Sequence, residues 1–260
     1  MTTDIFFFSG TGNTLSVARG LAALLEGTTV RPIRDFHDEK NIESTADRIV
    51  IAFPVYIFGV PLIVQEFIGK LSVRGNAKVY ALTTYGGMLA RAILSFRSLC
   101  EGRGIHLSGG FGVKMPGNYF PMYDVSPEMT QQKVFRAADA ALRAIAPVIR
   151  EGKKAGFDRS LGPLGIFLTY VMRKRVEKQI RGSDRNFITD GKCNACGRCV
   201  RVCPVENIEL VGSKVIMKGK CEMCFACFHW CPQQAIQYGK KTAARGRYHH
   251  PSIELKDITG

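Results

Sequence analysis

The sequence contains no long uninterrupted apolar run and no secretory leader pattern. Its longest apolar stretch, residues 50–68, is interrupted by Pro54 and Pro61, which excludes a membrane-spanning helix of about 20 apolar residues. Residues 5–8 form a short apolar segment near the N-terminus, and this segment is too short to be the apolar core of a signal peptide. We therefore expect a cytoplasmic protein.

Several signatures of common enzyme classes are also missing. The glycine-rich loop at residues 9–14 is not followed by Gly-Lys-Ser/Thr, so it is not a phosphate-binding loop of the Walker A type. Leu15 stands where a dinucleotide fingerprint needs glycine, so direct oxidation of a nicotinamide cofactor is not predicted. No Ser-His-Asp or paired-carboxylate arrangement is evident, and hydrolytic chemistry therefore has no support.

Acidic side chains are scarce relative to basic ones. The chain of 260 residues has 36 Lys and Arg against 22 Asp and Glu, a formal net charge of +14. Residues 151–260 hold most of the excess, with 20 basic and 10 acidic side chains. Such a balance suits nucleic acid, an anionic membrane surface or an acidic partner. No nucleic-acid-binding module is recognisable, so we do not expect a nucleic-acid partner.

Strand-like and helix-like segments alternate through the first 150 residues. The strand-like apolar segments are residues 4–8, 29–33, 48–53, 77–83 and 110–115, and the helical patterns are residues 15–25, 60–71, 88–102 and 128–151. Between the second and third strands, residues 38–46 offer only a short helix. This alternation predicts an α/β fold in which a parallel sheet is covered by helices on both faces.

The cysteines form an internal repeat. Eight of the nine lie between residues 193 and 231, and CNACGRCVRVCP at 193–204 recurs as CEMCFACFHWCP at 221–232. Each copy has the spacing C-x2-C-x2-C-x3-C-P, the run found in bacterial two-cluster ferredoxins. Zinc sites usually use two C-x2-C pairs separated by a longer loop, so this spacing favours iron–sulfur clusters over zinc. The ninth cysteine, Cys100, lies in a helical pattern and is expected to be a small buried residue.

Resemblance to two-cluster ferredoxins implies that each 4Fe-4S cluster takes three cysteines from one copy of the motif and the fourth from the other. The first cluster would be held by Cys193, Cys196, Cys199 and Cys231, and the second by Cys221, Cys224, Cys227 and Cys203. His229 and Trp230 directly precede a cysteine of the second copy, and we expect them to pack over a cluster and shield it from water.

The loop at residues 9–14 follows the first strand and precedes a helix. It consists of Ser9, Gly10, Thr11, Gly12, Asn13 and Thr14. Its hydroxyls and its backbone N–H groups at a helix N-terminus predict an anion site. In sequence and position the loop resembles the FMN phosphate loop of flavodoxins. That resemblance implies a doubly wound, five-stranded parallel sheet of order 2-1-3-4-5.

The same resemblance places the flavin between the loops that follow the third and fourth strands. These loops contribute Pro54, Val55, Tyr56, Phe58 and Gly59, and Thr84, Tyr85, Gly86 and Gly87. We expect Tyr56 and Tyr85 to stack on the flavin ring or to wall it, and the alternative is that they only cap the sheet. The loop after the fifth strand, residues 116–123, could have either of two roles. It could close over the flavin, or it could dock the cysteine-rich part.

The whole chain resembles fusions of a flavodoxin-like domain with a two-cluster ferredoxin domain. We expect a flavodoxin-like FMN-binding domain at residues 1–155, a connector with a basic helix at 156–184, a small α+β ferredoxin domain at 185–238 and a basic tail at 239–260. The connector is predicted to pack on one or both domains. The alternative is a helix on a membrane surface, because the connector's apolar run adjoins basic residues. The tail, with His249 and His250, is expected to be solvated.

These expectations describe an iron–sulfur flavoprotein that passes electrons between two 4Fe-4S clusters and FMN. The expected partner is a redox protein, either ferredoxin-like or a larger oxidoreductase, that acts as donor or acceptor. One alternative function is a flavin-dependent reductase of a small substrate bound over the flavin ring. Another is a scaffold or redox sensor whose tail and connector contact a membrane or a partner.

Overall fold

A five-stranded parallel sheet forms the centre of the larger domain. The computed structural model describes residues 1–160, 162–240 and 242–259. The strands of the sheet are β1 (Thr3–Phe7), β2 (Thr28–Pro32), β4 (Arg48–Pro54), β6 (Lys78–Tyr85) and β7 (Leu107–Lys114). Their order is β2-β1-β4-β6-β7, and every neighbouring pair is parallel. Counted among these five strands, this is the order 2-1-3-4-5, so the predicted doubly wound α/β fold is confirmed.

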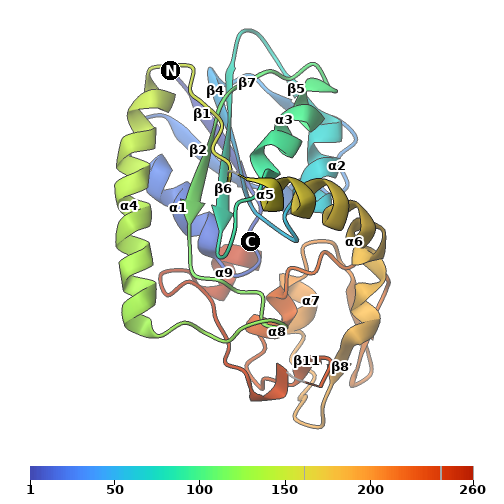
Figure 1. Cartoon of the computed structure of the whole chain (residues 1–260). Helices are drawn as coiled ribbons and strands as arrows, with labels where there is room; N and C mark the ends of the chain where they lie inside the picture. The colour runs from blue at the N-terminus through green and yellow to red at the C-terminus, as the bar shows by residue number, and fades with distance from the viewer. Residues whose placement is uncertain (161, 241, 260) are drawn as a thin grey trace.

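Helices cover both faces of this sheet (Figure 1). One face carries α1 (Asn13–Ala22) and α4 (Glu128–Arg150), and the other carries α2 (Leu62–Lys70) and α3 (Ala92–Glu101). Successive side chains of a strand point to opposite faces, so a sheet covered in this way buries its strands on both sides. In β1, Phe6 joins the core beneath α2 and α3, whereas Ile5 and Phe7 join the core beneath α1 and α4.

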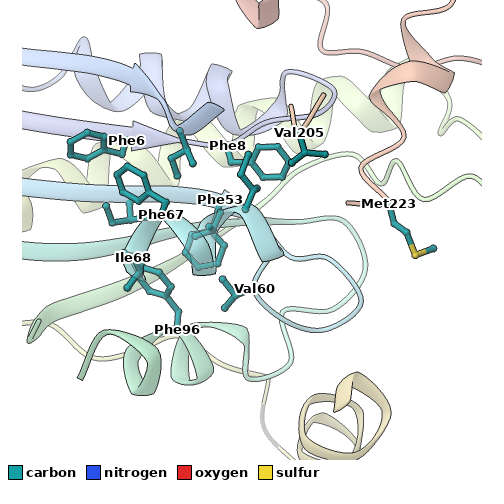
Figure 2. Close-up of a cluster of buried hydrophobic side chains, with 14 of the residues drawn as sticks. Phe6, Phe8, Phe53, Val60, Phe67, Ile68, Phe96, Val205 and Met223 are labelled. Atoms are coloured by element: carbon teal, nitrogen blue, oxygen red, sulfur yellow. The ribbon is translucent and has the colours of Figure 1, made fainter. Parts of the chain in front are cut away.

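The core beneath α2 and α3 reaches from the sheet into the cysteine-rich part. Phe53 and Phe96 are fully buried in it, with ring centroids 4.7 Å apart, and Cys100 is buried beside them as expected. The same cluster of apolar side chains includes Val205 and Met223 (Figure 2). The two parts of the chain are therefore joined by packed side chains as well as by the connector.

The crossover between the second and third strands of the sheet differs from the prediction. In place of a short helix at residues 38–46, the structure has the 3-10 helix η1 (Ile33–Phe36) and the strand β3 (Ile42–Ser44), which pairs in parallel with β5 (Leu71–Val73). Ile42 and Ser44 are buried, and Ser44 Oγ donates to Asp4 Oδ2 at 2.7 Å. Alternate burial is the period of a strand. The prediction of a short helix at this position is therefore wrong.

The connector forms a rod of successive helical segments on the outside of the larger domain (Figure 1). These segments are α5 (Pro163–Phe167), η2 (Leu168–Met172), which is one turn of π-helix, α6 (Arg173–Ile180) and the 3-10 helix η3 (Arg181–Asn186). The buried Arg173 guanidinium donates to the carbonyl oxygens of Tyr56 at 2.8 Å and Val60 at 2.6 Å. The connector is thus held against the loop that follows β4. Neither these segments nor any other helix in the described part of the chain is long and apolar enough to cross a membrane.

The cysteine-rich part consists of two antiparallel strand pairs and two short helices. β8 (Phe187–Thr189) pairs with β11 (Ile236–Tyr238), β9 (Ile208–Val211) pairs with β10 (Lys214–Met217), and the helices are α7 (Arg198–Val202) and α8 (Ala226–His229). The repeat in sequence is also a repeat in backbone conformation. Positive φ angles occur at equivalent positions of the two copies, in the pairs Ala195 and Met223, Gly197 and Phe225, and Glu206 and Gln234.

The tail is not the solvated segment that its composition predicts. It forms the 3-10 helix η4 (Thr242–Ala244) and α9 (Leu255–Thr259). Tyr248, His250 and Ile253 are buried, and the His250 N–H donates to the Thr11 carbonyl oxygen at 2.8 Å. The tail has too few apolar residues, at irregular spacing, to show a helix or strand period. Its burial depends on a surface supplied by the larger domain, which local sequence does not reveal.

Candidate cofactor sites

Two cavities in the cysteine-rich part are each lined by four cysteines. The first cysteine cavity is lined by Cys193, Cys196, Cys199 and Cys231, and the second by Cys203, Cys221, Cys224 and Cys227. In each set, three cysteines come from one copy of the motif and the fourth comes from the other copy. The fold therefore brings together the same two sets that resemblance to two-cluster ferredoxins implies.

The donor set of the second cysteine cavity fits a 4Fe-4S cluster. Backbone N–H groups donate to the cysteine sulfurs, from Asn207 to Cys203 and from Met223 to Cys221, both at 3.2 Å. Bonds of this kind favour thiolate sulfur and tune protein-bound clusters. Burial raises the pKa of Cys221 to about 11, so these thiols need a cationic core beside them to ionise at neutral pH.

The first cysteine cavity has the same construction but lies nearer the surface. The Ala235 N–H donates to Cys231 Sγ at 3.3 Å, burial raises the pKa of Cys199 to about 11, and Cys196 is exposed. Across residues 1–160, 162–240 and 242–259, no three His, Cys, Asp or Glu side chains are arranged to hold a single metal ion. The four cysteines around this cavity match the number of thiolate ligands that a 4Fe-4S cluster takes.

The loop at residues 9–14 joins β1 to α1 and borders a small polar cavity. This cavity is lined by Ser9, Gly10, Thr11, Asn13, Thr14, Pro54, Val55, Tyr56, Thr84, Tyr85, Gly86, Met115, Pro116 and Asn118. The hydroxyl oxygens of Thr14 and Thr84 lie 2.8 Å apart, so the first turn of α1 meets the end of β6 here. The N-terminus of α1 offers free N–H groups and a partial positive charge to an anion in this position.

A larger cavity, with a volume of about 540 Å³, adjoins the polar one. It is lined by Val55, Tyr56, Ile57, Phe58, Tyr85, Gly86, Gly87, Met88, Asn118, Tyr119, Met122, Tyr123, Val176, Met223, Cys224 and Phe225. Val55, Tyr56, Tyr85, Gly86 and Asn118 line both cavities. The pair therefore suits a ligand with a phosphate at one end and a flat apolar ring at the other.

Two of the residues predicted to bind the flavin or its phosphate lie outside both cavities. Gly12 has a φ of 91° and lies beneath Ile253 of the tail. Gly59 faces Arg173, and a methyl group at this glycine would lie 2.9 Å from Arg173 Nε. Both glycines permit close packing of a distant segment, and neither contributes to the cavity walls.

Residues that the sequence did not single out complete the large cavity. Val176 comes from the connector, and Met223 and Phe225 come from the second cysteine loop. No local pattern marks these three residues as ligand-binding, because three separate segments must pack before they share a wall. The loop at 116–123, by contrast, is recognisable in the sequence as a candidate covering loop, and it contributes Asn118, Tyr119, Met122 and Tyr123.

The hydroxyl group of Tyr56 lies in the interior, beside the backbone of Gly10. The hydroxyl is buried and makes no hydrogen bond within the described part of the chain, and burial raises its pKa well above the usual value. Leaving a buried polar group unpaired costs about 1–3 kcal/mol. The ring of Tyr56 packs edge-on against Phe8 at 5.8 Å, which holds this hydroxyl at the junction of the two cavities. The position fits a bond to a ligand.

The loop after β7 both covers the large cavity and docks the cysteine-rich part. The Tyr119 ring lines the cavity and lies edge-on to Phe225, with centroids 5.5 Å apart. His229 Nε2 donates to the Asn118 carbonyl oxygen at 3.0 Å, and the Tyr248 N–H donates to His229 Nδ1 at 3.2 Å. These bonds hold a neutral imidazole, and burial lowers the pKa of His229 to about 3.

His229 and Trp230, which we expect to pack over a cluster, have ring nitrogens that bond backbone carbonyl oxygens of the larger domain. Neither residue lines either cavity. Trp230 Nε1 donates to the Gly10 carbonyl oxygen at 3.0 Å, and its ring stacks on His249 with centroids 4.3 Å apart. Both residues fasten α8 to the larger domain. Their position next to a cysteine did not reveal this, because sequence does not show which side of α8 the larger domain covers.

The second cysteine cavity and the large cavity share a wall. Cys224 and Phe225 line both of them. The approach of the loops is close, because a methyl group at Gly10 would lie 2.9 Å from the Cys224 carbonyl oxygen and 3.0 Å from Tyr56 Oη. Only glycine leaves room for the loop at residues 9–14, whose expected ligand is a phosphate, to touch the cysteine loop at residues 221–227 at this point.

Comparison with known proteins adds a family match for the C-terminal part. Residues 185–232 match the family described as "4Fe-4S dicluster domain". Two curated relatives, both from Cereibacter sphaeroides, are named FMN-dependent NADH:quinone oxidoreductase. They are 34% identical over 106 residues, which is 40% of this chain and 54% of theirs. The chain thus spans about half the length of these curated relatives.

Solved structures also resemble part of this chain. An azoreductase from Bacillus anthracis is 15% identical, over 58% of this chain and 100% of that one, with a TM-score of 0.39. The flavodoxin of Megasphaera elsdenii is 17% identical, over 55% of this chain and 99% of that one, with a TM-score of 0.33. Both scores are below 0.5, so the fold assignment depends on the strand order and not on these neighbours.

Proposed function

We propose that this chain, a fusion of a flavodoxin-like sheet domain with a 4Fe-4S dicluster domain, is an iron–sulfur flavoprotein that exchanges electrons between two 4Fe-4S clusters and FMN. The observation that carries the proposal is that Cys224 lines both the second cysteine cavity and the large cavity. Sites that share a wall one residue thick need no diffusional encounter to exchange electrons.

The residues that would hold these cofactors follow from the cavity walls. The eight cysteines of the two cysteine cavities would hold the clusters. The loop at 9–14 would hold the FMN phosphate, while Tyr56, Tyr85 and the backbone of 84–87 would contact the flavin ring. When bound, the clusters supply one-electron transfer and FMN supplies one- or two-electron chemistry.

The chain itself keeps these sites together and limits access of water to the shared wall. Met223, Phe225 and Tyr119 contribute apolar groups to the wall of the large cavity, and Phe225 also lines the second cysteine cavity. The bond from Trp230 to Gly10 holds the cysteine loop on the phosphate loop. Fixing both sites in one folded unit sets their separation and removes the entropy cost of bringing two proteins together.

A reductase acting on a small substrate is the second candidate function. The large cavity, at about 540 Å³, is within the range of small-molecule sites, and its walls are mostly apolar. The name of the curated relatives includes quinone, a flat and largely apolar substrate. Because the chain has no dinucleotide fingerprint, we propose that electrons enter from a low-potential redox protein at the first cysteine cavity, where Cys196 is exposed.

The test of the proposed function begins with cofactor content. Anaerobically purified protein should contain about eight iron, about eight acid-labile sulfide and about one FMN per chain. Zinc in place of iron, or protein that binds no flavin, would overturn the proposal. The reduced protein is then mixed with an oxidised redox protein or with a small quinone. Saturable reoxidation by the quinone, with a KM raised by Met122→Trp in the cavity wall, would favour the reductase over the carrier.

A further inference from the structure

The outer face of the connector is unusually apolar for a protein surface. Thirteen large apolar side chains are exposed in the described part of the chain, and six of them lie in one nine-residue stretch of this rod. They are Leu164, Ile166, Phe167, Tyr170, Val171 and Met172. A cluster of exposed apolar side chains of this kind marks an interaction surface.

The inner face of the rod is defined by its bonds to the larger domain. Thr169 is buried, and its hydroxyl accepts the Arg91 N–H at 3.1 Å. Arg173, one turn further on, is buried and bonds the loop after β4. Because residues three and four apart share a helix face, these contacts turn the opposite face toward solvent.

The outer face changes from apolar to basic along its length. Leu164, Phe167 and Val171 follow one another at spacings of three and four, and they are 56%, 49% and 39% exposed. Lys174 and Lys178 continue the same spacing and are also exposed, as is Arg175. The rod therefore presents an apolar row followed by a basic row on a single face.

The one carboxylate of the α5–α6 rod lies on the inner side. Glu177 accepts a bond from Gln65 Nε2 at 2.9 Å and pairs with Arg173 at 3.4 Å. The basic side chains of the outer face are thus not neutralised by an acid of their own rod. Their charge adds to the excess of residues 151–260, which carry 20 basic and 10 acidic side chains.

We propose that this outer face docks the protein on an anionic lipid surface. Large apolar and aromatic side chains would enter the boundary between headgroups and acyl chains, and the adjoining lysines and arginine would meet the lipid phosphates. The rod lies on the outside of the molecule (Figure 1) and offers protruding side chains, which suits a yielding lipid surface. It is a short interfacial helix that lies on the membrane, and it does not cross it.

Docking would also orient the large cavity. Val176 lies on the same rod and lines that cavity, and Arg173 holds the loop that carries Tyr56 and Phe58. The lipid-facing residues and the cavity-lining residue are therefore on two faces of one helical element. A protein docked in this way would hold its large cavity close to the membrane surface.

Vesicle co-sedimentation of the anaerobically purified full chain tests the proposal. We expect binding to vesicles of equal parts phosphatidylcholine and phosphatidylglycerol, and much weaker binding to phosphatidylcholine alone. The double variants Phe167→Ser/Val171→Ser and Lys174→Glu/Arg175→Glu should each lower the affinity for the anionic vesicles by roughly tenfold or more. High salt should weaken binding of the wild type.

Matched control variants distinguish binding through this face from nonspecific binding through other exposed surfaces. Val211→Ser/Ile216→Ser removes exposed apolar side chains from the β9–β10 hairpin, and Lys133→Glu/Arg136→Glu removes exposed charge from α4. Both controls should bind as the wild type does. Equal losses in the controls, or no binding of the wild type to anionic vesicles, would overturn the proposal. So would a self-association of the wild type that Phe167→Ser/Val171→Ser abolishes while vesicle binding persists, because the face would then belong to a second copy of the chain.

Discussion

The two halves of the cysteine repeat share a backbone but differ in their surroundings. Cys196 and Cys224 occupy equivalent positions, yet Cys196 is exposed whereas burial raises the pKa of Cys224 well above that of an ordinary thiol. The difference arises because the second half packs against the phosphate loop and the large cavity. The duplicated motif thus sets which cysteines can hold a cluster, and the neighbours of each half set which way that site faces.

The equivalent residues Gly197 and Phe225 show the same contrast between the two halves. Gly197 and Phe225 both have positive φ angles, 71° and 56°. The conformation is free for glycine and costs a phenylalanine about 1–2 kcal/mol. In the second half the phenylalanine ring packs against Phe187 and Tyr119, with centroids 5.4 and 5.5 Å away. Packing between the domains therefore offsets a local strain that the first half does not have.

We expect the largest effect from two single variants, each of which removes one cysteine from one half of the repeat. Cys224→Ser should lower the iron content from about eight to about four per chain and abolish electron exchange between the remaining cluster and FMN. Cys196→Ser should also lose about four iron but keep exchange between the second cluster and FMN. Iron analysis and stopped-flow absorbance of the flavin measure both. If Cys196→Ser stopped the exchange as completely as Cys224→Ser, the two halves would not differ in their relation to the flavin site.

Replacement of Phe225 by glycine would make the second half resemble the first. Relief of backbone strain should stabilise the protein by about 1 kcal/mol, but loss of the buried ring should cost about 3–5 kcal/mol. We therefore expect a net loss of about 2–4 kcal/mol in the free energy of unfolding, measured by anaerobic urea titration. Gly197→Ala, the counterpart in the first half, should cost only about 1 kcal/mol. A Phe225→Gly variant as stable as the wild type would mean that the ring contributes little to the contact between the domains.

The tail that helps hold the second half in place makes stability depend on pH. Burial lowers the pKa of His250 to about 4, and the unfolded pKa is about 6.5. Between these values the unfolded chain binds a proton that the folded chain does not, so stability falls as pH falls through this window. Allowing for solvent screening, the loss is about 1–2 kcal/mol.

Two histidine variants of the tail test this dependence. His250→Asn should make the fall in the free energy of unfolding between about pH 6.5 and pH 4 smaller by about 1–2 kcal/mol. The part of the fall that comes from the buried His229, whose folded pKa is about 3, should remain. His249→Asn replaces an exposed neighbour and should leave the pH profile unchanged. Denaturation curves at several pH values measure both effects. An unchanged profile in His250→Asn would show that burial of this imidazole is not the source of the dependence.

The smallest expected effect concerns the bond between α8 and the phosphate loop. Trp230→Phe removes the donor to the Gly10 carbonyl oxygen, a loss of about 1 kcal/mol. The affinity for FMN should fall about fivefold, which flavin fluorescence titration of the flavin-free protein measures. The first half has Val202 at the equivalent position and offers no such donor. An unchanged affinity would show that the bond from Trp230 to Gly10 does not contribute to FMN binding by the loop at residues 9–14.

Local pattern predicted the parallel sheet, and the resemblance of the cysteine motif to two-cluster ferredoxins implied the grouping of the cysteines. The apolar segments of the first 150 residues have strand and helix periods, and these periods depend on nearest neighbours along the chain. The short segment at 38–46 was mispredicted as a helix, because the pairing of Ile42 and Ser44 with β5 is a contact that local spacing does not encode. The approach of Arg173 to Gly59 is likewise a contact between segments more than a hundred residues apart, which local spacing does not encode.

By itself the sequence determined the order of the elements, the two crossed sets of cysteines and the loops from which an FMN site would be built. The order of the elements follows from periodicity, whereas the cysteine sets and the FMN loops follow from the resemblance of short motifs to those of two-cluster ferredoxins and flavodoxins. Only the tertiary structure decided that Cys224 borders the large cavity, that Trp230 faces the phosphate loop and that the tail is buried. Each of these depends on surfaces from separate segments meeting after folding, and packing between such surfaces depends on shape that no single stretch of sequence contains.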